Sequence, residues 1–181
     1  SCMTIADLDG VYSSTSSCQG STNITTWGDL NLEGEWANTP INVYGRTPSS
    51  GTYDIFQKIA LCNGTYKKSI TELASARDIV DFVSRDTSSI GYSGAGLLAP
   101  GVKTVAIGES KENCYLPEPK HATSKQYPLT RDLYLYLKED PKGMKKTTRE
   151  FLKYIMSKNG QQSVIDAGLI TLPQILSLIH L

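Results

Sequence analysis

The spacing of apolar side chains along this 181-residue chain switches repeatedly between helical and extended periods. In residues 4–12, apolar positions recur three and four apart, so we expect a short amphipathic helix with Thr4 as its N-cap. Residues 41–44 alternate between apolar and polar side chains, which predicts a strand that ends at Gly45. By the same criteria we expect further helices at about 50–61, from Ser75 onward, at 150–158 and at 160–167, and further strands at 89–92, 102–107 and 133–137. Strands that alternate with helices predict an α/β fold with a parallel or mixed sheet flanked by helices.

Two segments suggest how this fold is divided along the chain. Residues 109–125 are charged and contain prolines, so we expect a connection there rather than a helix or a strand. Beyond it, residues 133–137 read Leu-Tyr-Leu-Tyr-Leu, which predicts a strand buried on both faces of a sheet. We therefore place a domain boundary within residues 109–125.

The charge balance narrows the classes of partner. The chain has 18 basic and 18 acidic residues, so no general field attracts nucleic acid or an anionic membrane, and electrostatic recognition has to be local. No stretch approaches the roughly 20 apolar residues that span a bilayer, and residues 1–10 lack the pattern of a signal peptide. We expect a soluble product from which any export signal has been removed.

The cysteines and histidines do not predict a metal site. The four cysteines, Cys2, Cys18, Cys62 and Cys114, form no Cys-x-x-Cys pair, and the chain has only two histidines, His121 and His180. We expect no bound metal and no cofactor. Disulfides could form in an oxidising compartment, and Cys2 and Cys18 are the pair closest in sequence, but four cysteines allow three pairings and also allow unpaired buried thiols.

The loop that follows the strand at 41–44 has the residue types of an anion site. The N-terminus of a helix presents backbone N–H groups without intrahelical partners and about half a positive charge. Gly51 lets the backbone approach a ligand closely, and the hydroxyls of Ser50 and Thr52 add donors. Arg46 can then close over a tetrahedral oxyanion with charge-assisted hydrogen bonds.

The same residues also fit a simpler role. Ser50 as a plain N-cap, Gly51 as a turn residue and Arg46 as a solvated side chain are equally compatible with the loop alone. The loop lacks the Lys-Ser/Thr ending of a nucleotide P-loop, so binding of ATP or GTP is not expected.

Five blocks along the whole chain resemble the substrate-binding proteins of ABC phosphate importers, a family with the two-lobed periplasmic-binding-protein type II fold. The blocks, in family order, are Thr26-Trp27-Gly28-Asp29-Leu30; Val43-Tyr44-Gly45-Arg46 with Ser50-Gly51-Thr52 and Phe56; Ile90-Gly91-Tyr92-Ser93-Gly94; Tyr127-Pro128-Leu129-Thr130-Arg131 with Leu133-Tyr134; and Phe151 to Ser157 with Gly160-Gln161, Gly168 and Leu172. The resemblance implies that Arg46, Ser50, Gly51 and Thr52 bind phosphate, while we expect Trp27 and Tyr92 to pack in the core. It also implies a location in the periplasm or on the cell surface of a bacterium and an ABC permease as partner.

The resemblance assigns the segments to lobes. Residues 4–108 correspond to the second lobe, 109–125 to the connection, and 126–181 to the returning C-terminal part of the first lobe. The N-terminal part of the first lobe, which supplies further donors and an acidic acceptor in the family, has no counterpart in this sequence. An incomplete first lobe would expose apolar surface, which predicts a homodimer or strand exchange.

Other function classes stay open on sequence grounds. Gly91-Tyr92-Ser93-Gly94-Ala95 approaches a nucleophile-elbow pattern but lacks its final glycine, and neither His121 nor His180 has the sequence context of a triad histidine. We therefore expect no enzyme activity. A sensory or interaction module that reuses the same fold, or a binder of another oxyanion, are the alternatives.

Overall fold

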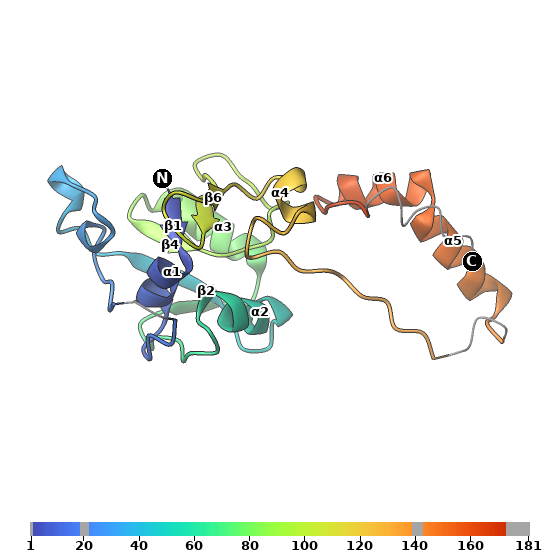
Figure 1. Cartoon of the computed structure of the whole chain (residues 1–181), viewed down its shortest axis with the longest axis horizontal. Helices are drawn as coiled ribbons and strands as arrows, with labels where there is room; N and C mark the ends of the chain where they lie inside the picture. Colours follow the sequence, from blue (N-terminus) through green and yellow to red (C-terminus); the bar gives the residue numbers. More distant parts are fainter. Residues whose placement is uncertain (1, 19–21, 139–142, 173–181) are drawn as a thin grey trace. The chain divides into compact units, whose positions relative to one another are not determined.

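The computed structural model describes residues 2–18, 22–138 and 143–172, and the chain divides into two compact units, 1–129 and 130–181 (Figure 1). The first unit contains, in chain order, β1 (Cys2–Thr4), α1 (Ile5–Tyr12), two 3₁₀ helices (Gly28–Leu30 and Gly34–Trp36), β2 (Asn42–Arg46), α2 (Gly51–Ala60), β3 (Thr71–Leu73), α3 (Ala76–Arg85), β4 (Ser89–Gly91), β5 (Ala106–Gly108), β6 (Cys114–Tyr115) and α4 (Pro119–Thr123). The predicted α/β class is confirmed.

One sheet of the first unit is fully parallel, with the strand order β3-β2-β4. The chain leaves β2 through α2 to reach β3 on one side, and then returns through α3 to β4 on the other side of β2. Because parallel crossovers are right-handed, these two connections place α2 and α3 on opposite faces of the sheet. The loops after β2 and β3, which are neighbouring strands, therefore diverge to opposite faces.

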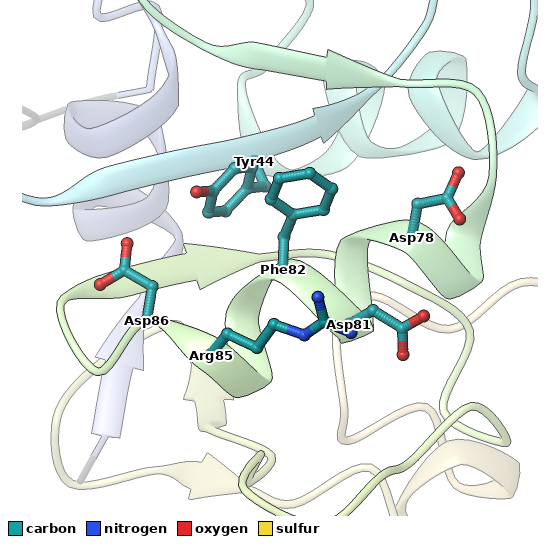
Figure 2. A pocket seen from close by; sticks show the side chains of 6 residues that line it. All are labelled: Tyr44, Asp78, Asp81, Phe82, Arg85 and Asp86. Atoms are coloured by element: carbon teal, nitrogen blue, oxygen red, sulfur yellow. The ribbon is translucent and has the colours of Figure 1, made fainter.

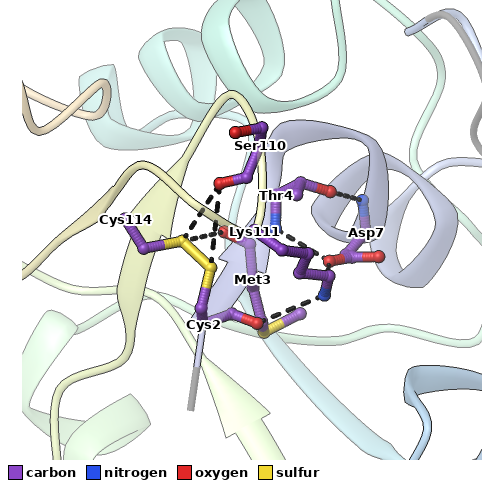
Figure 3. The surroundings of a disulfide bond; sticks show 7 residues. All are labelled: Cys2, Met3, Thr4, Asp7, Ser110, Lys111 and Cys114. Carbon is purple, nitrogen blue, oxygen red and sulfur yellow. Dashed lines mark hydrogen bonds and ion pairs between the residues drawn. A yellow bond between two sulfur atoms is a disulfide. The ribbon is translucent and has the colours of Figure 1, made fainter.

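The second sheet of this unit is mixed. β5 pairs in parallel with β1 and antiparallel with β6. A disulfide between Cys2 and Cys114 joins the outer strands, β1 and β6 (Figure 3). Beside it, the Lys111 ammonium forms an ion pair with the Asp7 carboxylate in the first turn of α1.

Helix α1 begins after Thr4, its predicted N-cap, and has a second capping hydrogen bond that the sequence analysis did not predict. Thr4 is the N-cap and accepts a hydrogen bond from the Asp7 amide at 3.1 Å, while the Asp7 carboxylate accepts one from the Thr4 amide at 2.8 Å. This is a capping box. Burial alone would raise the pKa of Asp7, but the hydrogen bonds from Lys111 and Thr4 outweigh it and hold that pKa below its ordinary value.

The core of the first unit is rich in aromatic rings. The Tyr92 ring stacks on Phe56 with centroids 3.9 Å apart, and Tyr12 packs edge-on against both rings. Tyr92 is buried and Trp27 packs against the same cluster, as expected from the sequence. A second disulfide joins Cys18, in the polar loop after α1, to Cys62, just beyond α2. The pair closest in sequence, Cys2 and Cys18, is therefore not the one that forms.

The prediction that residues 109–125 contain no helix or strand was wrong. β6 and α4 lie within this segment, and the boundary between the compact units falls between Leu129 and Thr130. β6 forms because β5 offers it an antiparallel partner, and Pro119 at the first turn of α4 suits a helix start despite its lack of an N–H. The pairing of β6 with β5 has no signature in composition, whereas Pro119 is a sequence signal of a helix start that the prediction missed.

The second unit contains α5 (Lys146–Met156) and α6 (Lys158–Asp166), which pack against each other. The predicted strand at 133–137 was wrong, because the segment forms neither helix nor strand (Figure 1). All five of its side chains are exposed. A strand needs a neighbouring strand to pair with, and none of the described strands lies in residues 130–172. Within the described residues, no helix is long and apolar enough to cross a membrane.

Candidate functional site

Arg46 is the last residue of β2, and its guanidinium is only partly engaged by the protein. One terminal nitrogen, Nη2, donates to the Ala74 carbonyl at 2.8 Å, in the loop between β3 and α3. The Nε–H is buried, and within the described residues it has no hydrogen-bond partner. A buried donor without an acceptor is costly, so this N–H is ready to donate to an oxygen atom of a ligand.

Helix α2 begins four residues after Arg46. Ser50 is its N-cap, and the Ser50 hydroxyl oxygen accepts a hydrogen bond from the Thr52 amide at 3.2 Å. The hydroxyl proton stays available for donation, since the oxygen uses a lone pair to cap the helix. Gly51, the first residue of the helix, is exposed, and its amide has no intrahelical acceptor.

The two halves of the site meet at the carboxyl edge of the parallel sheet. The loop after β2 leads to α2 on one face, and the loop after β3 leads to α3 on the other. Ligands of open α/β sheets bind in the crevice where neighbouring loops diverge in this way. The hydrogen bond from Arg46 to Ala74 joins the end of β2 to the loop after β3. The structure therefore brings Arg46, Ser50, Gly51 and Thr52 into one loop and helix start at a position suited to an anion.

Sequence reasoning missed the residues that support this loop from inside. The Tyr92 hydroxyl accepts a hydrogen bond from the Arg46 amide at 3.0 Å, and the Tyr66 hydroxyl donates to the Tyr53 carbonyl at 2.9 Å. Tyr92 lies 46 residues from Arg46, so no local pattern could have linked them. Tyr92 was expected only to pack.

A surface hollow lies elsewhere on the first unit. It has a volume of about 400 Å³ and is lined by Tyr44, Asp78, Asp81, Phe82, Arg85 and Asp86 (Figure 2). Figure 2 shows the rings of Tyr44 and Phe82 facing each other between β2 and α3, with their centroids 5.4 Å apart. None of the four predicted anion-site residues lines this hollow. We do not assign the hollow to the anion site, because its rim carries three carboxylates.

The structure gives the hydrolase alternative no support. A nucleophile elbow lies on a turn from a strand into a helix, but residues 92–105 after β4 contain no helix. The Ser93 hydroxyl donates to the Ala76 carbonyl at 3.2 Å, while the His121 ring packs 5.1 Å from Tyr115. His180 lies outside the described residues. In the part of the chain that the structure describes, no cluster of three or more His, Cys, Asp or Glu residues could hold a metal ion.

One protein family and several curated relatives match this chain. The profile of the family described as "PBP superfamily domain" matches residues 3–159. The phosphate-binding protein PstS of Pseudomonas aeruginosa is 37% identical over 173 residues, which cover 94% of this chain and 54% of that protein. The PstS of Staphylococcus saprophyticus is 29% identical over 152 residues, covering 82% of this chain and 46% of the relative. The chain thus spans about half the length of the curated relatives it matches.

Solved structures agree on the fold. An ABC-type phosphate transport receptor from Vibrio cholerae matches with a TM-score of 0.67 and 18% identity, over 95% of this chain and 64% of that chain. PstS from Borrelia burgdorferi matches with a TM-score of 0.65 and 19% identity, over 96% and 64%. At these identities the likeness shows a shared fold.

Proposed function

This chain belongs to the family of PBP superfamily domains, and on that premise we propose that it binds inorganic phosphate through Arg46, Ser50, Gly51 and Thr52, as part of a substrate-binding protein of an ABC importer. The name of the Pseudomonas relative, a phosphate-binding protein, supports the choice of ligand. The arrangement of the four residues around one helix start supports the choice of site.

The observation that carries the proposal is the buried Nε–H of Arg46, which has no acceptor among the described residues and lies four positions before the N-cap of α2. An oxyanion placed there would accept from the guanidinium, from the Gly51 amide and from the hydroxyls of Ser50 and Thr52. Charge-assisted hydrogen bonds of this kind are roughly twice as strong as neutral ones. The helix dipole adds favourable interaction with negative charge at the same place.

The partner and the location follow from the same proposal. A binding protein of an importer delivers its ligand to a membrane permease, so we propose an ABC permease as partner and an extracytoplasmic location. Two disulfides in the structure fit an oxidising compartment. The homodimer expected from the sequence stays a prediction, and the exposed apolar side chains of residues 133–137, Phe151 and Ile165 support it.

Isothermal titration with phosphate, sulfate and acetate tests the proposal. We expect heat of binding with phosphate and a comparable response with sulfate, because the four proposed residues offer only donors and both ligands are tetrahedral oxyanions. We expect a weaker response with acetate, which has two acceptor oxygens instead of four. Stronger binding of sulfate than of phosphate would move the assignment to another oxyanion. The absence of any heat with phosphate would contradict the proposed function.

A further inference from the structure

A chain of buried tyrosine hydroxyls links the two ends of the anion loop, by which we mean residues 46–53. The Arg46 amide donates to the Tyr92 hydroxyl at 3.0 Å, the hydroxyls of Tyr92 and Tyr66 lie 3.3 Å apart, and the Tyr66 hydroxyl donates to the Tyr53 carbonyl at 2.9 Å. Each hydroxyl has one proton. Since Tyr66 uses its proton on Tyr53, Tyr92 has to be the donor to Tyr66. The chain of donors therefore runs in one direction, from the Arg46 amide to the Tyr53 carbonyl.

The two ends of this chain are the two ends of the anion loop. Arg46 is the last residue of β2, and Tyr53 lies in the first turn of α2, immediately after Thr52. Between them lies the segment that holds Ser50 and Gly51. The hydroxyl chain thus links the residue that carries the guanidinium to the helix start that carries the amides, and it fixes the separation of these two sets of donors.

The tyrosine rings are held in place by packing. Tyr92 lies flat on Phe56, with 7° between the ring planes, and the rings of Tyr66 and Tyr53 lie 4.3 Å apart. Gly45 permits the close approach of Ile70 to β2, because a Cβ at Gly45 would lie 3.0 Å from the Ile70 side chain, and the Tyr92 ring lies at ordinary contact distance, 3.4 Å, from the same point. Tyr92 and Tyr66 are 8% and 9% exposed, so water competes little for their hydroxyls.

Burial also keeps both hydroxyls protonated. It raises the pKa of Tyr66 far above its ordinary value, and it raises the pKa of Tyr92 despite the hydrogen bond from the Arg46 amide, which acts in the opposite direction. Neither group loses its proton near neutral pH. The hydrogen-bond chain therefore stays complete over the pH range in which a phosphate carrier works.

We propose that Tyr92 and Tyr66 are positioning residues of the anion site, which set the distance between Arg46 and the N-terminus of α2 through their linked hydroxyls. This assignment rests on the proposed function. Neither residue touches the ligand; each acts through the backbone of a residue at one end of the loop. Pre-organised donors bind more tightly than mobile ones because less ordering is needed on binding.

Three Tyr→Phe variants of the full chain test the assignment. Tyr92→Phe and Tyr66→Phe each keep the ring and break the hydroxyl chain. Tyr12→Phe is the matched control, since Tyr12 packs against the same rings and its buried hydroxyl has no partner within the described residues. Titration with inorganic phosphate, at a temperature where every variant is fully folded, should show roughly tenfold weaker binding for the first two variants and unchanged binding for Tyr12→Phe.

A second readout separates positioning from general stabilisation. We expect Tyr92→Phe to accelerate hydrogen exchange of the Arg46 amide, followed by NMR, by at least about tenfold without affecting amides in β5. A purely structural role would lower the free energy of unfolding but leave both the phosphate affinity and the Arg46 exchange rate of the folded protein unchanged, and that result would overturn the assignment. If the unsubstituted protein binds phosphate, and if Tyr92→Phe and Tyr66→Phe bind it as tightly, the positioning role is contradicted while the proposed function stands. If the unsubstituted protein binds no phosphate, the proposed function fails, and this assignment fails with it.

Discussion

Arg46 has a fixed backbone and a partly engaged side chain. Its amide donates to a buried tyrosine hydroxyl, and its guanidinium donates to the Ala74 carbonyl, whereas its buried Nε–H has no partner among the described residues. A rigid backbone with an under-used charged head is what a ligand-binding arginine requires. The same residue in a purely structural role would be expected to satisfy its donors inside the protein.

The buried hydroxyl of Tyr12 yields a prediction about stability. Its hydroxyl is buried with no partner in the described part of the chain, so burial of that group is uncompensated and raises the pKa of Tyr12 well above its ordinary value. Tyr12→Phe should leave the free energy of unfolding unchanged or raise it by about 1 kcal/mol. Urea denaturation measures this, with Tyr66→Phe as the comparison that should lose stability. A loss of more than about 1 kcal/mol in Tyr12→Phe would reveal a hydrogen bond that this account lacks.

The residues of the site differ in how far sequence could predict them. Ser50, Gly51 and Thr52 follow a strand and open a helix, so the role proposed for them could be predicted from the seven consecutive positions 46–52. The supporting hydroxyls of Tyr92 and Tyr66 lie 46 and 20 positions from Arg46 in sequence, and they meet it only because the sheet and α2 fold together. Long-range contacts between polar groups have no periodic signature.

Among the elements, three helix caps and the strand β4 were predictable, whereas β1 and β3 were not. Thr4 and Ser50 are N-caps in the structure, and Ser75 caps the helix predicted to begin there, because capping depends on a few neighbouring residues. β1 and β3 have three residues each and are defined by their partners β5 and β2, which are distant in the sequence. The same dependence on partners explains why the apolar run at 133–137 is not a strand here.

Loss of the N-cap of α2 should affect both stability and phosphate binding, whereas loss of the N-cap of α6 should affect stability alone. Ser50→Ala removes a cap and a proposed phosphate donor, so we expect a loss of about 1 kcal/mol in the free energy of unfolding and weaker phosphate binding. Ser157 caps α6 by accepting from the Gly160 amide at 3.2 Å, in the second compact unit. Ser157→Ala should cost similar local stability with no change in phosphate affinity. Equal affinity in both variants would remove Ser50 from the site.

For the molecule as a whole, covalent links set the stability of the first unit. The disulfides Cys18–Cys62 and Cys2–Cys114 lie in that unit and span 44 and 112 positions of sequence. The four cysteines were found at the outset, but their pairing depends on which strands and loops become neighbours. Composition allowed three pairings, and the fold selected this one.

Removal of either disulfide should destabilise the first unit. From loop-closure entropy we expect Cys18→Ala with Cys62→Ala to lower the free energy of unfolding by about 4 kcal/mol, and Cys2→Ala with Cys114→Ala by about 5 kcal/mol. Urea denaturation under non-reducing conditions measures both, and reduced unsubstituted protein provides the combined effect. An unchanged midpoint in either pair of substitutions would show that its disulfide does not constrain the unfolded chain.

The central claim, that this chain binds phosphate through Arg46, is tested most directly by isothermal titration of phosphate into Arg46→Ala beside the unsubstituted protein. Arg85→Ala is the control, because Arg85 is an exposed arginine in the last turn of α3. We predict binding by the unsubstituted protein and by Arg85→Ala, and a loss of about 10- to 100-fold in affinity for Arg46→Ala, the value of charge-assisted hydrogen bonds. The same affinity in Arg46→Ala as in the unsubstituted protein would contradict the account.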